Sequence, residues 1–591
     1  MKLTKEIAAE LFRELASEAW RCLRSDFHNS GALGRLSKFT SLEDAAAKAL
    51  AEYKGWLVLN GLTSLSDTAA KALARHKGRL CLNGLASLSD EAANALGNHR
   101  AVERSSLISR SVGGSGLELN GLATLSDAAA EALARHEGRL CLNGLASLSD
   151  VAARSLGNNR EIEPGTVGLE LNSLATLSDA AAEALGAHQG SLELSGLKSL
   201  SEIAAKSLSR HGGPLSLNGL TSLSDSAAKA LSGLRGMLEL NGLNSLSDAA
   251  AEALGAHQSP LKLDGLTGLS DAAAKTLGKR EGGFADLSLN GVINLSDTAA
   301  TELARCEGSL YLNGLTSLGE AAASALGQHE GWHLELNGLT SLSVAVAEAL
   351  ARHNGQFDGL KLDGLKSLSP ATAAALAQHK GWLFLNGLTD LSDAAAEALA
   401  RHQTRNGNKR LHLSGLTSLG AVAANALAGG FLCLDGLTSL SDAAAKSLGG
   451  KNGHLGLDGL TSLSDAAAEA LGGNKEVINL NGLTSLSDTA AASLARCEGV
   501  LSLNGLTTLS EVAAKSLGGK KGRGLYLDGL VFLSDTAAAS LARCEGSLHL
   551  SGLTSLSDAA AKSLSEKEGP LGLGDAATRA VKRAKKAGKL R

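Results

Sequence analysis

The sequence has few aromatic residues. Its 591 residues include 4 Trp, 3 Tyr and 8 Phe, so aromatic side chains make up 3% of the chain. Large aromatic side chains dominate compact cores, and this supply is too small for the about four ordinary domains that the length suggests. The apolar content of 44% still allows extensive burial, which argues against a disordered chain.

An excess of charge of one sign and long apolar runs are also missing. The 56 Lys and Arg nearly balance the 60 Asp and Glu, so the whole chain has no net attraction to nucleic acid or to an anionic membrane. No apolar run approaches the ~18 residues that a membrane-spanning helix needs. These absences predict that the chain does not span a membrane.

The first 25 residues, MKLTKEIAAELFRELASEAWRCLRS, lack the apolar segment of a secretion signal. Leu3, Ile7, Leu11 and Leu15 recur at every fourth position, which predicts an amphipathic helix. We interpret this helix as a cap on the chain that follows. The alternative, an anchor on a membrane surface, is disfavoured because the polar face carries charges of both signs.

One repeated pattern fills the rest of the chain. Leu-x-Leu-Asn-Gly-Leu-x-x-Leu-Ser-Asp-x-Ala-Ala-x-x-Leu occurs in 21 copies, and 12 of the 20 intervals between copies are 23 residues long. Half-copies precede the array (Leu42 to Leu50) and follow it (Leu571 to Leu573). Such a repeat is the signature of a solenoid, in which each unit buries its apolar face against its neighbours. The first position of each copy is 57, 80, 117, 140, 169, 192, 215, 238, 261, 287, 310, 334, 360, 383, 411, 432, 455, 478, 501, 525 and 548.

Each copy changes its period internally. Leu57 to Leu59 alternates as a short strand does, and Asn60-Gly61 predicts a tight turn with left-handed backbone geometry. Ser66 stands at the N-cap position of a helix. Small and apolar residues from Ala69 to His76 then recur with helical spacing. Each copy is therefore predicted to be a strand, a turn and a helix of about three turns.

Stacking these units predicts an α/β fold. Parallel strands stack at ~4.8 Å, whereas helix axes need ~8–10 Å. The mismatch bends the stack into an open, right-handed arc of about 21 repeats, with the parallel sheet on the concave side and the short helices on the convex side. We divide the chain into a helical N-terminal cap (1–35), the solenoid (36–574) and a basic C-terminal segment (575–591).

The pattern resembles that of the leucine-rich repeat superfamily. Within it, Leu303 to Leu312, with the sequence Leu-Ala-Arg-Cys-Glu-Gly-Ser-Leu-Tyr-Leu, is similar to the Ala-Phe-x-x-Cys segment and strand of the bacterial BspA-like subclass. Here Leu replaces the subclass's Phe, and Asn, Asp or Ser replaces the Pro that follows its strand. The resemblance covers about nine-tenths of the chain. It implies a bacterial protein that binds through its strand surface.

Two columns of repeated polar residues call for a structural interpretation. The position after the second strand leucine holds 13 Asn, 5 Asp and 3 Ser. These types bond to nearby backbone and can form a ladder between copies, which we favour over a row of ligand-binding amides. A second column lies three residues after the last helical leucine. It holds His76, His99, His136, His188, His211, His257, His329, His353, His379 and His402, with Cys306, Cys497 and Cys544 in other copies.

Histidine and cysteine in one column raise the question of a metal site. Zinc needs ligands that converge at ~2.0–2.3 Å, and successive copies stand too far apart at the helix layer. A histidine at a helix C-terminus is favourable by itself. We therefore expect no metal and no cofactor. Cys81 and Cys141 lie two strands apart, beyond disulfide reach, so we expect free thiols and a cytoplasmic location.

The middle strand position varies most from copy to copy. It lies between two leucines that face the core, so it faces the hollow of the predicted arc. Neighbouring columns barely change, and we interpret this one as a partner-binding surface, with drift on a solvated face as the alternative. The candidate residues are Glu118, Glu170, Glu193, Glu239, Lys262, Tyr311, Glu335, Lys361, Phe384, His412, Tyr526 and His549.

Catalytic arrangements find little support. Glu170 and Glu193 are predicted to be neighbours, and paired carboxylates can hydrolyse glycosides, but an open arc does not enclose a substrate. Serine and aspartate occupy fixed scaffold positions, and no phosphate-binding Gly-Lys-Ser/Thr loop occurs. We therefore expect a protein that is not an enzyme.

Three other features remain open. Trp56, Trp332 and Trp382 precede strands and either anchor an interface or cover their own copies. Segments 98–116, 161–167 and 403–410 lengthen connections on one rim and are either binding loops or relaxed linkers. The C-terminal segment holds Arg579, Lys582, Arg583, Lys585, Lys586, Lys589 and Arg591, and we favour a solvated cap over a nucleic-acid site for it.

The sequence therefore favours a cytoplasmic scaffold or recognition protein that binds a protein partner along its concave strands. The alternative is binding of nucleic acid or another polyanion through the basic C-terminal segment.

Overall fold

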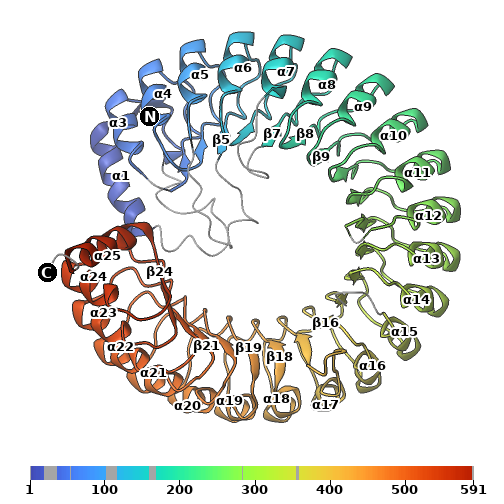
Figure 1. The fold of residues 1–591 in the computed structure, drawn as a ribbon. Coiled ribbons are helices and arrows are strands. Elements are labelled where there is room, and N and C mark those ends of the chain that lie inside the picture. The colour runs from blue at the N-terminus through green and yellow to red at the C-terminus, as the bar shows by residue number, and fades with distance from the viewer. Residues whose placement is uncertain are drawn as a thin grey trace. The chain divides into compact units, whose positions relative to one another are not determined.

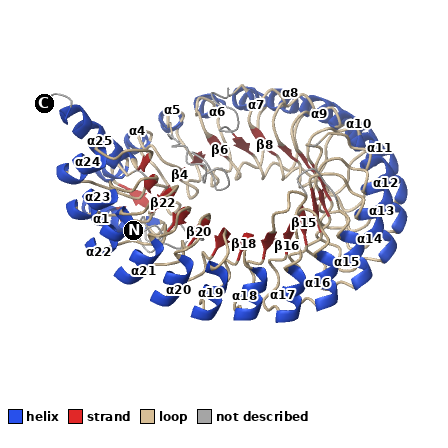
Figure 2. Cartoon of the chain, turned by 60° about the horizontal axis from the view of Figure 1, so that its bottom comes forward, coloured by secondary structure: helices blue, strands red, loops and turns tan. Residues whose placement is uncertain are grey.

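The computed structural model describes residues 2–18, 36–53, 55–100, 116–158, 168–282, 284–353 and 359–588. The chain forms two compact units, Met1–Leu310 and Tyr311–Arg591. Within each unit short strands alternate with short helices, and the strands form a parallel sheet whose one face is covered by the helices (Figures 1 and 2). The strands of a unit lie on its inner side and the helices on its outer side.

Strands and helices alternate along the first unit. They are β1 (Lys2–Leu3), α1 (Lys5–Glu18), β2 (Ser41–Leu42), α3 (Asp44–Leu50), β3 (Leu57–Val58), α4 (Asp67–Leu73), β4 (Leu80–Cys81), α5 (Asp90–Leu96), β5 (Gly116–Glu118), α6 (Asp127–Leu133), β6 (Arg139–Cys141), α7 (Asp150–Gly157), β7 (Gly168–Glu170), α8 (Asp179–Leu185), β8 (Ser191–Glu193), α9 (Glu202–Leu208), β9 (Leu215–Ser216), α10 (Asp225–Leu231), β10 (Leu238–Glu239), α11 (Asp248–Gly255), β11 (Leu261–Lys262), α12 (Asp271–Leu277), β12 (Leu287–Ser288) and α13 (Asp297–Leu303).

Strand β13 (Leu310–Tyr311) falls at the boundary of the two units. The second unit continues with α14 (Glu320–Leu326), β14 (His333–Glu335), α15 (Val344–Leu350), β15 (Gly359–Lys361), α16 (Pro370–Leu376), β16 (Trp382–Phe384), α17 (Asp393–Leu399), β17 (Arg410–His412), α18 (Ala421–Leu427), β18 (Gly430–Cys433), α19 (Asp442–Gly449), β19 (Gly453–Gly456), α20 (Asp465–Leu471), β20 (Val477–Asn479), α21 (Asp488–Leu494), β21 (Val500–Ser502), α22 (Glu511–Gly518), β22 (Gly524–Tyr526), α23 (Asp535–Leu541), β23 (Ser547–Leu550), α24 (Asp558–Ser565), β24 (Leu571–Leu573) and α25 (Asp575–Gly588).

The register confirms the repeat. The first leucine or isoleucine of each of the 21 copies lies in β3 to β23 and is at most 4% exposed. Within each unit these residues pair with their counterparts in the next strand, as Leu57 does with Leu80 and Leu360 with Leu383. Parallel strands in chain order, each followed by a helix on one face, make the fold an α/β leucine-rich-repeat solenoid, as the sequence predicts.

The helices are shorter than predicted. Ser66 caps α4 as expected, because its Oγ accepts a hydrogen bond from the Ala69 amide at 3.1 Å, and Pro370 occupies the first turn of α16. However, α4 has seven residues, about two turns instead of three. After Leu73 the backbone tightens, and the His76 amide bonds to the Leu73 carbonyl only three residues back. The tight end returns the chain to the next strand.

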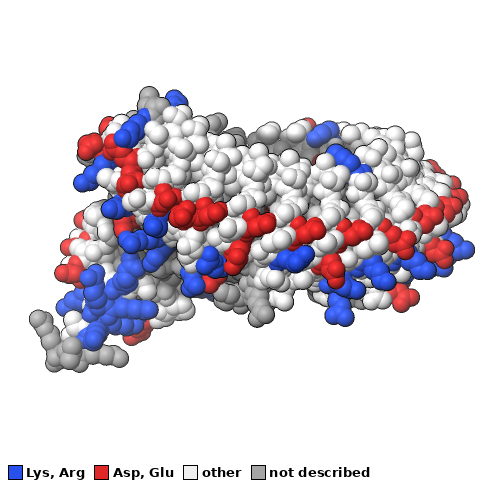
Figure 3. All heavy atoms as spheres, turned by 90° about the horizontal axis from the view of Figure 1, so that it is seen from above, with Lys and Arg blue, Asp and Glu red and all other residues white. Residues whose placement is uncertain are grey.

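The starts of the helices are linked from copy to copy. The Oγ of Ser89 donates to Asp67 at 2.5 Å, and the Oγ of Ser270 donates to Asp248 at 2.6 Å. The aspartate of one copy thus accepts a bond from the capping serine of the next. These acidic residues form the red row along the outer surface in Figure 3.

The glycine of each Asn-Gly turn has a role that differs from the predicted one. Gly61 and Gly84 do not have positive φ angles. Instead, a Cβ on Gly84 would collide with the backbone carbonyls of Asn60 and Leu62 in the preceding copy. Glycine is needed because consecutive turns pass each other closely, so the prediction of left-handed geometry is wrong at this turn.

The N-terminal segment is a further strand–helix unit. Leu3, which the sequence placed on a helix face, lies in β1 and pairs with Leu42 of β2. Helix α1 follows and packs on α3 with Ala8 and Leu11 buried. Thr4 stands between the strand and the helix, at the position of the capping serine in the later copies, and its carbonyl accepts the Ala8 amide. That this segment acts as a cap stays a prediction.

Some sequence features have only partial structural descriptions. Insertions 98–116 and 161–167 lie largely or wholly outside the described residues, whereas 403–410 forms a closed turn in which the Thr404 amide bonds to the Asn408 carbonyl. No helix in the described ranges combines the length and apolar character needed to cross a bilayer. The six described cysteines are free thiols.

Candidate functional site

The side of each sheet that faces away from the helices is formed by two columns of side chains. We call it the inner strand face. One column is the middle position that the sequence identified, and the other is the residue just before the first leucine of each copy, such as Arg79, Arg139 or Trp382. Both point the same way because they lie two residues apart on a strand. The sequence analysis missed the second column, although strict alternation would have found it.

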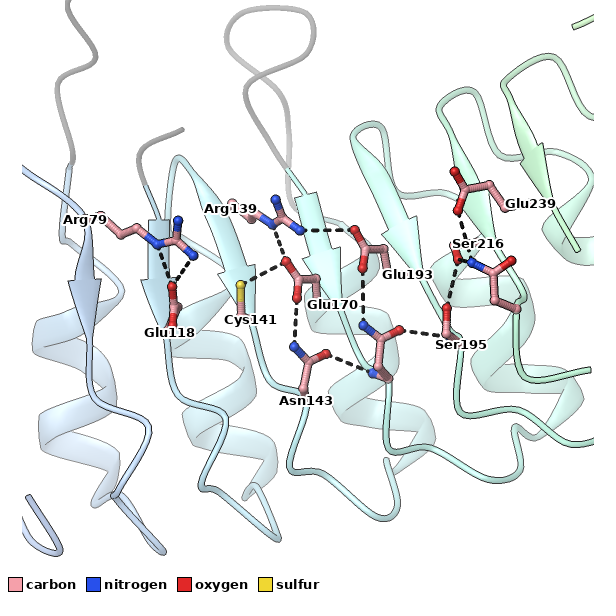
Figure 4. A network of polar contacts seen from close by, with 12 residues as sticks. Arg79, Glu118, Arg139, Cys141, Asn143, Glu170, Glu193, Ser195, Ser216 and Glu239 are labelled. Atoms are coloured by element: carbon pink, nitrogen blue, oxygen red, sulfur yellow. Dashed lines mark hydrogen bonds and ion pairs between the residues drawn. The ribbon is translucent and has the colours of Figure 1, made fainter. Parts of the chain in front are cut away.

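In the first unit the inner strand face is a chain of charged contacts (Figure 4). Arg79 forms an ion pair with Glu118 of the next strand. Arg139 bonds to Glu170 and, at 3.1 Å, to Glu193 one strand further. Lys262 pairs with Glu239 at 2.7 Å. The acidic half of the predicted column is therefore largely neutralised by basic residues of the same face.

The asparagine ladder, the column of polar residues that follows the second strand leucine of each copy, binds some of these glutamates by hydrogen bonds. The Oδ1 of Asn143 accepts the Asn172 amide at 3.0 Å, which confirms the predicted ladder between copies. The Nδ2 of Asn143 donates to Glu170 at 2.7 Å, and Asn83 does the same for Glu118 at 2.7 Å. Through its Oδ1, Asn143 thus accepts a hydrogen bond from the backbone of the next copy, and through its Nδ2 it orients a glutamate side chain of the inner strand face.

These contacts shift the pKa values of ionisable groups on the inner strand face. Burial alone would raise the pKa of Glu118, but the Asn83 hydrogen bond and the Arg79 charge together lower it below its ordinary value. Glu239 behaves in the same way, with Lys262 and Asn218 outweighing burial to lower its pKa. Burial and then the charge of Glu118 raise the pKa of the Cys81 thiol to about 12. The glutamates are therefore charged and the thiol protonated at neutral pH.

The twelve candidate residues of the middle strand position differ in how deeply they are buried. Glu118, Glu170 and Glu335 are each only 8% exposed, so they form the floor of the face. The other nine are half-buried and open to solvent: Glu193, Glu239, Lys262, Tyr311, Lys361, Phe384, His412, Tyr526 and His549.

The second unit carries a different chemistry on the same face. Trp382, Phe384, His412, Phe431 and His454 form what we call the aromatic strip, across β16 to β19. Phe384 and His412 stack with ring centroids 4.2 Å apart, as do Phe431 and His454. The Trp382 ring lies 5.5 Å from His412 and 5.3 Å from Phe431. All five side chains are half-buried.

Cations flank this strip. The Arg410 guanidinium lies 4.5 Å from the Trp382 ring centroid, and the Lys361 ammonium lies 5.4 Å from that of Phe384. Lys361 also pairs with Glu335. Of the three tryptophans weighed in the sequence, Trp382 therefore belongs to a ring cluster and Trp56 is covered by Arg79 at 4.8 Å.

The ten histidines of the second column form a buried structural ladder. Each is at most 1% exposed, and neighbouring rings stack with centroids between 5.3 and 6.3 Å apart. Burial lowers the pKa of His99 to about 3 and of His136, His188 and His257 to about 4. These four rings are therefore neutral at pH 7, so the predicted attraction of a charged histidine to the helix end does not account for them.

Two of the ten rings form hydrogen bonds to the backbone of the preceding copy. The Nδ1 of His136 lies 2.8 Å from the His99 carbonyl, and that of His353 lies 2.8 Å from the His329 carbonyl. Where histidine is replaced, the new residue is often another donor. Arg280 donates to the His257 carbonyl at 2.5 Å, and Lys520 donates to the Gly499 carbonyl at 2.6 Å. At these four positions the column thus binds carbonyls in the loops of the preceding copy.

Among the described residues, these side chains form neither a cluster that could hold a metal ion nor a pair of unbound carboxylates at Glu170 and Glu193. Within the described ranges, no three His, Cys, Asp or Glu side chains are placed to hold a metal ion. The stacked imidazoles lie in parallel and do not converge on one point. Glu170 and Glu193 are neighbours in register, as predicted, but both carboxylates are bound to Arg139.

The basic C-terminal segment is helical over its described part. Ala577, Ala580 and Val581 of α25 are buried, and the helix packs on α24. Its opposite side forms the dense basic group at the lower left of Figure 3. The exposed cations are Arg579, Lys582, Arg583, Lys585 and Lys586.

Comparison with known proteins adds little to this description. No family profile matches the sequence, and no curated protein matches it. Among solved structures, the chain is similar to a leucine-rich-repeat protein of Leptospira interrogans, with 17% identity, a TM-score of 0.28, and 77% of this chain and 95% of that chain covered. It is also similar to the Toll–Spatzle complex of Drosophila, with 15% identity, a TM-score of 0.33, and 66% and 46% covered. Both TM-scores are low, so the fold assignment rests on the repeat and its register.

Proposed function

We propose that this protein is a non-enzymatic scaffold or recognition protein that binds a protein partner along its inner strand face. One observation supports this most strongly. The residues of this face change from copy to copy while the leucines, alanines and capping serines around them stay constant. A solenoid needs only its buried columns to fold, so its folding does not demand the variety of this face.

The composition of the face fits such a role. Half-exposed Tyr311, Phe384 and Tyr526 are of the residue types that contribute most to protein interfaces. The charged contacts of the first unit are pre-formed, so their side chains lose little conformational freedom on binding. By its resemblance to the BspA-like subclass, the protein is proposed to be bacterial, and its free thiols suggest a reducing cytoplasm.

Affinity capture from a lysate of the source organism tests this proposal. The inner-face variant replaces Glu193, Tyr311, Phe384 and Tyr526, which lie in both units, with Ser. The matched control replaces Val151, Ile203, Val422 and Val512, which are 49–61% exposed on the helices, with Ser. We expect a protein that binds the wild type and the control but not the inner-face variant. Partners that bind all three proteins equally would contradict the proposal.

A second candidate function is polyanion binding through α25. The observation in its favour is that five cations share the exposed side of one helix, and no ion pair between them and an acidic residue is formed in the described part of the chain. The same arrangement suits a solvated cap on α24.

Charge-neutral substitutions separate these two roles of α25. Replacing Lys582, Arg583 and Lys586 with Gln keeps the buried Ala577 and Val581, so the cap stays in place. We expect double-stranded DNA to bind the wild type at low salt, to bind this variant more weakly, and to dissociate as salt is added. Equal binding by both proteins, or none at low salt, would leave α25 as a cap only.

A further inference from the structure

The aromatic strip is an unusual concentration of large rings. The chain has only 15 aromatic residues, and three of them lie close together on one face, Trp382 and Phe384 on β16 and Phe431 on β18. The core beneath them is already filled by the leucine columns, since Leu383, Leu411 and Leu432 are at most 1% exposed. The rings therefore fill no gap in the core, and they leave apolar surface in water.

The surroundings of the strip keep it accessible. Gly359 precedes it on β15, Cys433 lies beside it on β18, and Gly456 closes it on β19. None of these residues carries a side chain long enough to cover the rings. The strip is thus bounded by small residues at these three positions, while Lys361 and Arg410 lie over the Phe384 and Trp382 rings, which remain half-buried.

Charges of both signs lie beside the strip: Lys361 and Arg410 lie over its rings, and Asp435 and Asp458 lie near Cys433 and His454 at its other end. Lys361 is neutralised by Glu335. Arg410, by contrast, has no carboxylate partner within the described residues, and its guanidinium lies against the Trp382 ring. A guanidinium in this position offers several N–H donors to an incoming carboxylate while its flat side stays on the ring.

The first unit contains a comparable pair with a different outcome. Arg79 lies 4.8 Å from the Trp56 ring centroid, but it is already bound to Glu118. The acidic residues around it also disfavour a negatively charged ligand. The cation beside a tryptophan is therefore paired with a carboxylate in the first unit and has no such partner among the described residues of the second.

We propose that the aromatic strip binds an acidic, aromatic-containing protein segment, with an apolar side chain of the segment on Trp382 and Phe431 and a carboxylate on Arg410. This inference rests on the proposed function, because it names the kind of partner that the inner strand face takes. The apolar contact supplies most of the affinity, and the single charge pair selects for acidic over basic segments.

Peptide binding measured by fluorescence anisotropy tests the inference directly. The probe is a labelled synthetic peptide of alternating Glu and Tyr. The comparison peptides replace Glu with Lys, or Tyr with Ser. We expect the Glu-Tyr peptide to bind at least about tenfold more tightly than either comparison peptide, since one charge pair or one aromatic anchor accounts for that difference. Equal or stronger binding of the Lys-Tyr peptide, or no binding of the Glu-Tyr peptide, would overturn the inference.

Two substitutions locate the site. Arg410→Gln removes the charge but keeps a polar side chain, and we expect about tenfold weaker binding of the Glu-Tyr peptide. Arg79→Gln is the matched control, since it removes the equivalent cation over Trp56, and it should leave binding unchanged. Unchanged thermal unfolding shows that each variant is folded. Equal effects of the two substitutions would contradict a site on the aromatic strip.

The outcome is separable from that of the proposed function. If a captured partner is lost from the inner-face variant but binds Arg410→Gln as tightly as wild type, the scaffold function stands and the aromatic strip is not its site. If neither set of substitutions affects any partner, both proposals fail.

Discussion

Gly84 lies where the turn of one copy passes the turn of the copy before it. A side chain there would meet the carbonyl oxygens of Asn60 and Leu62, which belong to rigid backbone. We predict that Gly84→Ala lowers the free energy of unfolding by about 1–3 kcal/mol, because the two turns must move apart. Chemical denaturation followed by circular dichroism measures this change.

Gly268 provides the control for this substitution. It also lies in a connection of the first unit, but no atom lies within 4 Å of the place where its Cβ would be. Gly268→Ala should leave stability unchanged or raise it slightly, because alanine restricts the unfolded chain. Equal losses at Gly84 and Gly268 would show that the close approach of the turns is not the reason for the conserved pattern of glycines within the chain.

At the scale of a strand and its turn, the ladder constrains which residues can follow one another. The five Glu residues of the middle column each follow a copy whose ladder residue is Asn, never Asp. The Nδ2 of that Asn donates to the glutamate, as Asn143 does to Glu170 at 2.7 Å. An aspartate would keep the backbone bond but place a second carboxylate beside the first.

We therefore predict that Asn143→Asp destabilises the protein by about 2 kcal/mol at pH 7. The loss should shrink as the pH falls and one of the two carboxylates becomes protonated. Asn241→Asp is the control, because the residue that follows it on the inner strand face is Lys262 and not a glutamate. Urea unfolding of the two variants at pH 7 and pH 4 tests this, and equal stability of both at pH 7 would contradict the explanation.

The sequence predicts elements well where period and chemistry agree. Leu57, Ser66 and Leu73 mark a strand, a helix start and a helix end that the structure confirms. The sequence predicts local structure less well where that structure depends on a contact between residues far apart in the chain. The function of Gly84 depends on a carbonyl 24 residues earlier, and the pairing of Leu3 with Leu42 joins segments whose sequences only partly follow the repeat.

The site was foreseeable only in part, for a physical reason. Alternation places Arg139 and Cys141 on the same face, and this signal was present in the sequence. The partners of Arg139, however, lie on two other strands, at Glu170 and Glu193. Which glutamate an arginine reaches depends on side-chain conformations that a repeat pattern does not encode.

At the scale of the whole molecule, the buried histidine ladder links stability to pH. Four of its members, His99, His136, His188 and His257, have pKa values of about 3 to 4 in the folded chain, because burial disfavours their charged form. Unfolded histidines titrate near pH 6.5. The unfolded state therefore binds more protons below that pH, so the ladder's contribution to stability is complete above pH 6.5 and is lost as the pH falls towards 4.

We predict a steep fall in melting temperature between pH 6.5 and pH 4, since each buried histidine costs up to about 1.4 kcal/mol per pH unit. Scanning calorimetry across this range measures it. In His136→Gln, which cannot titrate but can still donate a hydrogen bond, the fall should be shallower than in wild type. A melting temperature that stays constant from pH 7 to pH 4.5 would contradict the neutral, buried ladder.

The central claim concerns the inner strand face, and hydroxyl-radical footprinting of the protein with its captured partner tests it most directly. Aromatic side chains react readily when exposed, and Tyr311, Phe384 and Tyr526 are half-exposed in the free chain. The account predicts that the partner protects at least one of these side chains, while Val151, Ile203 and Val512 on the helices react as before. Protection confined to the helices, with all three aromatic side chains still reactive, would contradict it.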